Sequence, residues 1–273
     1  MKLEEFAKQI LFGESLEDKL FTPKKILFAE DFELLREIPT SPGRKSNIKL
    51  SDKNIRFPRG HFHLDEKKAI ALHSFANHEL LAIEMMAAAL LIYPHDTPEL
   101  LQFKKGIVGT LKDEQKHLTL YINRLNSIGY EFGDYELNDY FWSQMSLLRT
   151  PEEYLSVMAL TFEAANLDFA YFYKEEFSKV DDMKTADILE VVLKDEISHV
   201  AFGVNYLNRW RGDKKLSDYY MSCLPGNLTP ARAKGKMFMR DLREQTKMPQ
   251  EYIEWIKSYQ DDFQITKRKE WKS

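Results

Sequence analysis

Apolar residues recur at helical spacing along most of this chain, and that periodicity constrains its fold more than any other feature. Leu72, Phe75, Ile83, Met86 and Leu90, for example, share one face of a helix. Strict alternation of apolar and polar residues, which is typical of a half-buried strand, is nearly absent. The pattern therefore predicts an all-α protein.

Four long helices account for most of this periodicity, and their ends carry residues that begin and end helices. Thr97 followed by Pro98 suits a helix start, and Gly129 lies just past the expected end. Thr150, with Glu153 three residues later, suits a capping box. The expected helices span residues 65–93, 97–128, 151–178 and 182–210.

The links between these helices indicate how they are connected. Short links near "YPHDT" and "SKVDD" predict two antiparallel hairpins, and the longer segment 129–150 permits a crossover between them. Two hairpins joined by one long connection is the topology of ferritin-like four-helix bundles. We expect a helical and loop extension at 1–64, the bundle at 65–212, and a C-terminal helical extension packed on it at 213–273.

Composition indicates an ordinary globular protein, since 44% of its 273 residues are hydrophobic. The longest uncharged stretch of the most apolar region, residues 85–95, is far shorter than the roughly 20 residues that span a bilayer. The N-terminus lacks the basic and then apolar pattern of a secretory signal. The single cysteine, Cys223, fits a reducing compartment and a structural role. We expect a cytoplasmic protein with no membrane association.

The net charge of −4 argues neither for nor against a nucleic-acid partner. Two local stretches are basic, residues 44–68 and residues 232–247. Solvated surface is the favoured interpretation of both, ahead of a phosphate-binding site.

Two Glu-x-x-His motifs place charge within apolar helical faces. Glu114 and His117 in "LKDEQKHL", and Glu196 and His199 in "LKDEISHV", each lie one helical turn apart, so both side chains of a pair can reach one metal ion. Two further acids, Glu79 and Glu163, are candidates to complete the set, because the segments around them resemble each other. The chain reads as a pseudo-repeat of two halves.

In each half a second acid follows five residues later, and the level of each acid along its hairpin distinguishes the two. With a turn near residue 96, Glu79 lies 17 residues before it and Glu114 lies 18 after it, an offset of about 1.5 Å. Glu84 misses that level by about 9 Å. The same comparison favours Glu163 over Asp168 as the partner of Glu196.

The resulting set holds four carboxylates and two histidines, the ligands of a carboxylate-bridged dinuclear metal site. The alternative is a metal-free polar network, in which each buried pair satisfies itself by hydrogen bonds. Four carboxylates at one level of an apolar bundle repel one another strongly unless cations neutralise them, so a metal site is favoured. The predicted ligands are Glu79, Glu114, His117, Glu163, Glu196 and His199.

The segments "HELLAIE", "DEQKHL" and "DEISHVAFG" resemble the ferritin-like di-iron carboxylate superfamily, which includes rubrerythrin, bacterioferritin and several oxygenases. More narrowly, they look like an uncharacterised bacterial ferritin-like family that is similar to tRNA-modifying di-iron hydroxylases. The motifs cover residues 75–203. The resemblance implies that Glu114 and Glu196 bridge the metals, while Glu79 with His117 and Glu163 with His199 complete the two ends. It also implies two iron ions, with manganese as the alternative, and dioxygen as co-substrate.

Residues near these motifs carry weaker expectations. Asp113 and Asp195 either orient the histidines or lie on the surface, with neither interpretation preferred. Structural roles are favoured over catalytic ones for the others: Asn77, His78, Glu84, Asn166, Asp168, Tyr121, Tyr171, and the loop residues His61 and His63.

Three functions remain open at this point: a di-iron oxidase or oxygenase, an iron storage or detoxification protein, and a helical interaction module with a structural metal. The long extensions favour the enzyme, because they are suited to enclosing a pocket, whereas a storage shell needs the outer faces of its bundle free. We expect a monomer or dimer with a small-molecule substrate. RNA stays among the possible substrates, on the resemblance to tRNA hydroxylases and the basic stretches.

Overall fold

The computed structural model describes residues 1–29, 32–51, 53 and 55–266, and within them the chain is helical. Extended backbone pairs there at two isolated parallel bridges, Lys2 with Leu27 and Leu50 with Leu137. The prediction of an all-α protein is confirmed. The chain divides into two compact units. Unit 1 comprises Met1–Ser146 and Lys179–Ile188, and unit 2 comprises Leu147–Ser178 and Leu189–Ser273.

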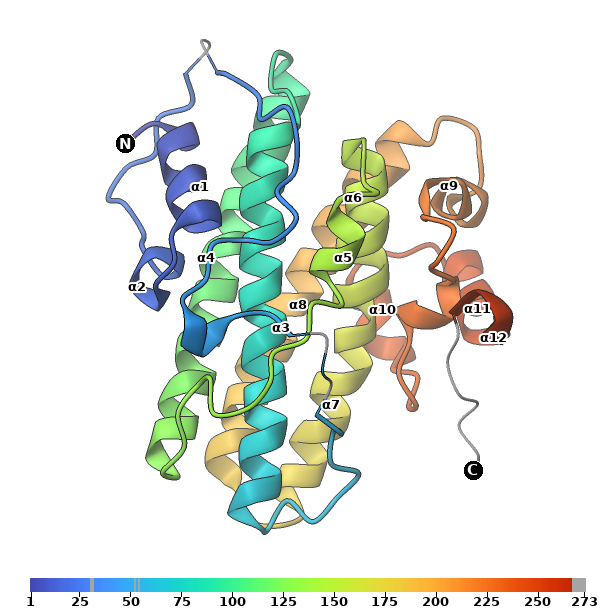
Figure 1. Ribbon diagram of the computed structural model, residues 1–273. Helices are drawn as coiled ribbons and strands as arrows, with labels where there is room; N and C mark the ends of the chain where they lie inside the picture. The colour runs from blue at the N-terminus through green and yellow to red at the C-terminus, as the bar shows by residue number, and fades with distance from the viewer. Residues whose placement is uncertain (30–31, 52, 54, 267–273) are drawn as a thin grey trace. The chain divides into compact units, whose positions relative to one another are not determined.

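Unit 1 is built on a helical hairpin, in which α3 and α4 lie side by side while α1 packs on α3 (Figure 1). The Thr97 hydroxyl accepts the Leu100 N–H at 3.2 Å, and Gly129 follows α4 in the left-handed region with φ +82°. These ends agree with the sequence prediction to within a residue. The elements are α1 (Leu3–Phe12), α2 (Leu16–Lys19), the 3-10 turn η1 (Ser46–Ile48), α3 (Asp65–Ile92), α4 (Pro98–Ser127) and α5 (Trp142–Met145).

Helix α3 is apolar on nearly every face and packs against α1, α2, α4 and α5. It is long and apolar enough to cross a membrane by length and composition alone, yet 83% of its most apolar stretch is buried within the protein. Burial of this extent is what the central helix of a packed core requires.

The long connection after α4 runs alongside α3. His73 Nε2 accepts the backbone N–H of Gly133 at 2.9 Å, and Asn77 donates to the Asn138 carbonyl at 3.0 Å. One residue further along α3, the ring of His78 stacks on Phe141. The contacts follow the same order on both segments, so the connection runs parallel to α3.

Unit 2 contains the second long hairpin and the C-terminal helices. Thr150 and Glu153 form the expected capping box, with hydrogen bonds of 3.3 and 3.2 Å between each backbone N–H and the other side chain. Its elements are α6 (Pro151–Val157), a π turn η2 (Met158–Glu163), α7 (Ala164–Ser178), α8 (Met183–Trp210, which begins in unit 1), α9 (Leu216–Cys223), the 3-10 turn η3 (Pro230–Ala233), α10 (Arg240–Gln245), α11 (Gln250–Ser258) and α12 (Phe263–Thr266).

The π turn interrupts the helix that the sequence predicted as continuous over 151–178. Thr161 donates its hydroxyl hydrogen bond to the Ser156 carbonyl at 2.8 Å and also contacts the Tyr220 hydroxyl of α9 at 2.7 Å. Helix α8 approaches this turn closely at Gly203, where a Cβ atom would stand 2.3 Å from the Cβ of Ala159. Glycine is therefore required at that crossing.

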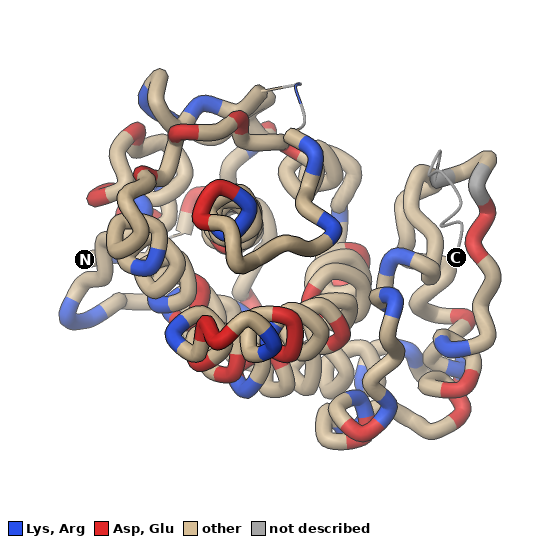
Figure 2. The backbone as a smooth tube through the Cα atoms, turned by 90° about the horizontal axis from the view of Figure 1, so that it is seen from below, with Lys and Arg blue, Asp and Glu red and all other residues tan. Residues whose placement is uncertain are grey.

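Charged residues of both signs are interspersed along the backbone (Figure 2). Some of them fasten helix ends together within unit 1. Asp182, just before α8, is buried and receives Arg124 at 2.8 Å and Lys68 at 3.1 Å. These ion pairs join the start of α8 to the start of α3 and the end of α4.

Candidate metal centre

Unit 1 gathers Glu79 from α3 with Glu114 and His117 from α4. One ligand atom from each lies within 4.8 Å of the other two, and all three side chains are buried. His117 Nδ1 lies 3.4 Å from Glu114 Oε2 and 4.0 Å from Glu79 Oε2. The i, i+3 spacing on α4 places Glu114 and His117 on one face, and the antiparallel hairpin brings Glu79 to the same level.

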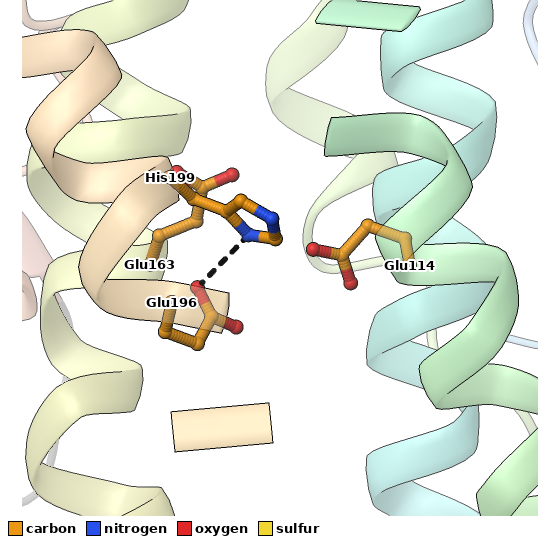
Figure 3. Close-up of side chains that lie close together, drawn as sticks. All are labelled: Glu114, Glu163, Glu196 and His199. Carbon is orange, nitrogen blue, oxygen red and sulfur yellow. Dashed lines mark ion pairs between the residues drawn. The ribbon is translucent and has the colours of Figure 1, made fainter. Parts of the chain in front are cut away.

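Unit 2 gathers the matching set of Glu163, Glu196 and His199. Glu163 is the last residue of the π turn, whereas Glu196 and His199 lie one turn apart on α8 (Figure 3). One ligand atom from each again lies within 4.8 Å of the other two, and His199 Nδ1 faces Glu196 Oε2 at 3.5 Å. Across both units the six candidate side chains are at most 8% exposed.

The two oxygens of Glu196 have different surroundings. Oε1 accepts the Asn166 amide at 2.6 Å, while Oε2 is buried with no hydrogen-bond donor among the described residues. A buried, ionised carboxylate oxygen without a donor costs on the order of 1–3 kcal/mol or more. This oxygen lies beside His199 Nδ1, so a cation held by both atoms would remove that cost.

Glu84 has a different environment from Glu79, five residues earlier on the same helix. Its carboxylate receives Arg44 through two hydrogen bonds, at 3.0 and 2.7 Å, and Lys19 at 3.0 Å. All three side chains are at most 1% exposed. Burial lowers the pKa of Lys19, and the charge of Glu84 partly opposes that shift. Glu84 is therefore neutralised by protein cations.

Asp168 stands in the same relation to Glu163 in unit 2. It receives both terminal nitrogens of Arg243, at 2.6 and 2.9 Å, and the backbone N–H groups of Gly235 and Met239, both at 2.7 Å. Arg243 also donates to the carbonyl of Ala164, the first residue after the π turn, at 3.1 Å. The C-terminal segment thus braces the turn that carries Glu163.

Comparison with known proteins gives a family. A family model described as "Protein of unknown function (DUF455)" matches residues 10–254. The chain belongs to this family. A curated relative from Haemophilus influenzae, described as an uncharacterized protein, is 26% identical over 252 residues, which is 88% of this chain and 85% of that relative. No solved structure matches the chain.

In this DUF455 protein most basic residues of the first stretch, such as Lys45, Lys49 and Arg56, are exposed, as are Lys236 and Lys247 of the second, but each stretch has an exception. Arg44, from the first stretch, is buried against Glu84, and Arg243, from the second, is buried against Asp168. Arg243 is therefore not available to bind a phosphate group. Arg240 is engaged by Glu244 and Gln250 on the surface.

Other residues of the DUF455 protein have structural contacts. Asn77 bonds to the connection after α4, and Tyr121 is buried against Phe75 with ring centroids 5.6 Å apart. Cys223 is a free, buried thiol, and burial raises its pKa. Asp113 is half-exposed and lies near Lys116. His61 and His63 are exposed beside the start of α3.

Two site features escaped sequence reasoning. The π turn has no simple sequence signature, since apolar residues dominate it. The bond from Asn166 to Glu196 had a signal, because an amide three residues after Glu163 replaces the Ala82 found three residues after Glu79. The structure gives Asn166 a hydrogen bond, and its partner is a candidate ligand.

Proposed function

We propose that this DUF455 protein is a ferritin-like di-iron oxidoreductase that uses dioxygen to oxidise a substrate, most simply a small molecule. The observation that carries the proposal is the pair of buried groups, each with two glutamates and a histidine whose ligand atoms lie within 4.8 Å of one another. By the resemblance of their motifs, these groups are the halves of one dinuclear centre in a four-helix bundle.

The donor atoms fit such a centre. Carboxylate oxygens and imidazole nitrogens suit iron or manganese, and no thiolate belongs to either group. Each histidine presents Nδ1 to the glutamate one turn earlier, at 3.4 Å in unit 1 and 3.5 Å in unit 2. A metal ion placed between these two atoms would bind both of them.

Charge balance gives independent support. The acids that follow Glu79 and Glu163 by five residues are neutralised by arginine and lysine. Glu196, in contrast, keeps one buried oxygen without a hydrogen-bond donor among the described residues. Because a protein tolerates a buried charge only when it is paired or binds a metal, that oxygen favours a cation.

When bound, two iron ions would supply the electrons that reduce dioxygen. The role of the protein would be to hold the ions and to keep bulk water away from them. Glu79, Glu114 and His117 in unit 1, and Glu163, Glu196 and His199 in unit 2, would hold them. Burial of all six side chains excludes bulk water, which strengthens the electrostatic interactions between the ligands and the ions.

The firm attachment of both terminal extensions favours an enzyme over an iron store. Residues 1–48 supply Lys19 and Arg44 to Glu84, and the C-terminal segment supplies Arg243 to Asp168. Helix faces covered in this way are not free to build a storage shell. Because Arg243 is buried, a small organic substrate is preferred to RNA. A cytoplasmic location stays a prediction.

Anaerobic iron loading followed by metal analysis tests the centre. We expect about two ions per chain, and loss of the dinuclear site in Glu114→Ala and in Glu196→Ala. The matched control is Asp113→Ala, which removes a half-exposed carboxylate adjacent to a ligand and keeps the stoichiometry. Fewer than one ion per wild-type chain, with unchanged folding, would leave the metal-free network as the explanation.

Exposure of the loaded protein to air separates the enzyme from the store. We expect a monomer or dimer that consumes dioxygen without accumulating iron. A large shell that retains tens of irons per chain would show that storage is the function.

A further inference from the structure

Asn166 is the side chain that fixes the orientation of the Glu196 carboxylate in unit 2. It lies on α7, one turn after Glu163, and its amide N–H donates to Glu196 Oε1 at 2.6 Å. A hydrogen bond to an ionised acceptor is short and roughly twice as strong as a neutral one. The bond therefore holds the carboxylate in one orientation.

That orientation has a chemical consequence. With Oε1 held by Asn166, Oε2 is turned to the side of His199 Nδ1, at 3.5 Å, where no described residue donates a hydrogen bond to it. Residues that hydrogen-bond to a metal ligand in this way orient the ligand and strengthen metal binding. Their loss typically weakens metal binding by about 10- to 100-fold.

The pseudo-repeat shows that packing alone does not require an amide at this position. The corresponding residue of unit 1, three after Glu79, is Ala82, which is buried in α3. Asparagine is a poorer helix former than alanine by up to about 0.7 kcal/mol. Unit 2 thus carries a less favourable helix residue where it bonds a candidate ligand.

We propose that Asn166 is a positioning residue of the metal centre, which acts through Glu196 to raise the affinity of the centre for its ions. This inference rests on the proposed function. The amide serves as a fixed donor to Oε1 and leaves Oε2, beside His199 Nδ1, to bind a metal.

Metal affinity of the full-length protein tests the inference, with cobalt(II) as the probe. Cobalt(II) takes the same oxygen and nitrogen ligands, and its visible absorption reports the coordination geometry. We expect Asn166→Ala and Asn166→Leu to bind cobalt about 10- to 100-fold more weakly than the wild type, with an altered spectrum. Alanine leaves space at the site, whereas leucine keeps the branched shape of asparagine and is somewhat larger, so agreement between the two variants assigns the loss to the missing donor. Asn166→Gln, which retains an amide donor, should recover part of the affinity.

Asn77→Ala is the matched control, because it removes an amide two residues before Glu79 that donates to the Asn138 carbonyl. It should lower thermal stability while leaving cobalt affinity within a few-fold of the wild type. If Asn166→Ala and Asn166→Leu bind two ions with wild-type affinity and spectrum, Asn166 is merely structural and the inference is overturned. If the wild type itself binds no cobalt, the proposed function fails first.

Discussion

Glu84 in unit 1 and Asp168 in unit 2 occupy equivalent positions of the pseudo-repeat, yet they are neutralised in different ways. Glu84 faces two cations from the N-terminal segment, Lys19 and Arg44. Asp168 faces one cation, Arg243, and two backbone N–H groups. In each unit a buried acid is therefore neutralised, by the N-terminal segment in unit 1 and by the C-terminal segment in unit 2.

The largest expected effect comes from removing these two acids. Glu84→Ala leaves two buried cations without a counter-charge, and Asp168→Ala leaves one, so both should lower the free energy of unfolding by about 3–5 kcal/mol. Glu84→Ala should be the more severe. Urea denaturation measures the loss, with Glu190→Ala, which breaks a partly exposed ion pair to Lys174, as a control expected to cost less than about 1 kcal/mol. Equal and small losses in both variants would show that the buried charges are solvated.

The two units should also differ in their response to acid. In unit 1, His73 accepts backbone hydrogen bonds from Gly133 and Tyr135, and burial lowers its pKa from 6.5 to about 4. The stabilising contribution of the neutral ring is complete above the unfolded pKa of about 6.5 and is lost as the pH falls toward 4. A difference of this size corresponds to roughly 3 kcal/mol at most.

His73→Gln tests this directly, because glutamine accepts hydrogen bonds but does not titrate. Its unfolding free energy should fall less than that of the wild type between about pH 7 and about pH 5. The hydrogen bond between Thr161 and Tyr220 in unit 2 does not change in this pH range, since burial raises the pKa of Tyr220 well above its usual value. Parallel pH curves for the wild type and His73→Gln would contradict the prediction.

Two helix glycines should respond to alanine with opposite signs. In unit 2, Gly203→Ala places a Cβ 2.3 Å from that of Ala159, so overpacking should cost about 1–3 kcal/mol. In unit 1, Gly109 is exposed within α4, and a Cβ there meets nothing within 4 Å. Gly109→Ala should therefore stabilise the protein by about 0.5–1 kcal/mol. Thermal unfolding of both variants checks the signs.

A smaller loss than at Gly203 is expected for the bond between α9 and the π turn. Tyr220→Phe removes the hydroxyl that meets Thr161 at 2.7 Å and should cost about 1 kcal/mol. Tyr130→Phe, which alters a tyrosine of unit 1 outside the core, is the control. A loss above about 3 kcal/mol would indicate that the hydroxyl supports the whole turn.

The sequence predicted correctly the features that depend on residues close to one another in the chain. The caps at Thr97 and Thr150 were readable because a side chain there bonds a backbone group three residues away. The levels of Glu79 and Glu114 followed from helical rise and one turn position. In contrast, the partners of Glu84 and Asp168 lie 40 and 75 residues away, and no short-range rule selects Arg44 or Arg243 from among the other basic residues.

The same distinction applies to the site. The Glu-x-x-His spacing named the side chains that the structure brings together in each unit, and their role as metal ligands stays a prediction. The π turn that ends at Glu163 was missed, because a π turn forms only when the surrounding structure accommodates the extra residue. Here Gly203 and Tyr220, both distant in sequence, provide that surrounding.

The burial of Glu84 against Lys19 and Arg44 has a consequence for how the chain can be divided. A fragment limited to the four long helices would retain an acid in the interior of α3 and lose both of its counter-charges. The same fragment would lose Arg243 from Asp168. The terminal segments are thus part of the folding unit rather than additions to it. Within the family, a change at position 84 or 168 should be accompanied by a change at the distant basic residue, so that charge is conserved as a pair.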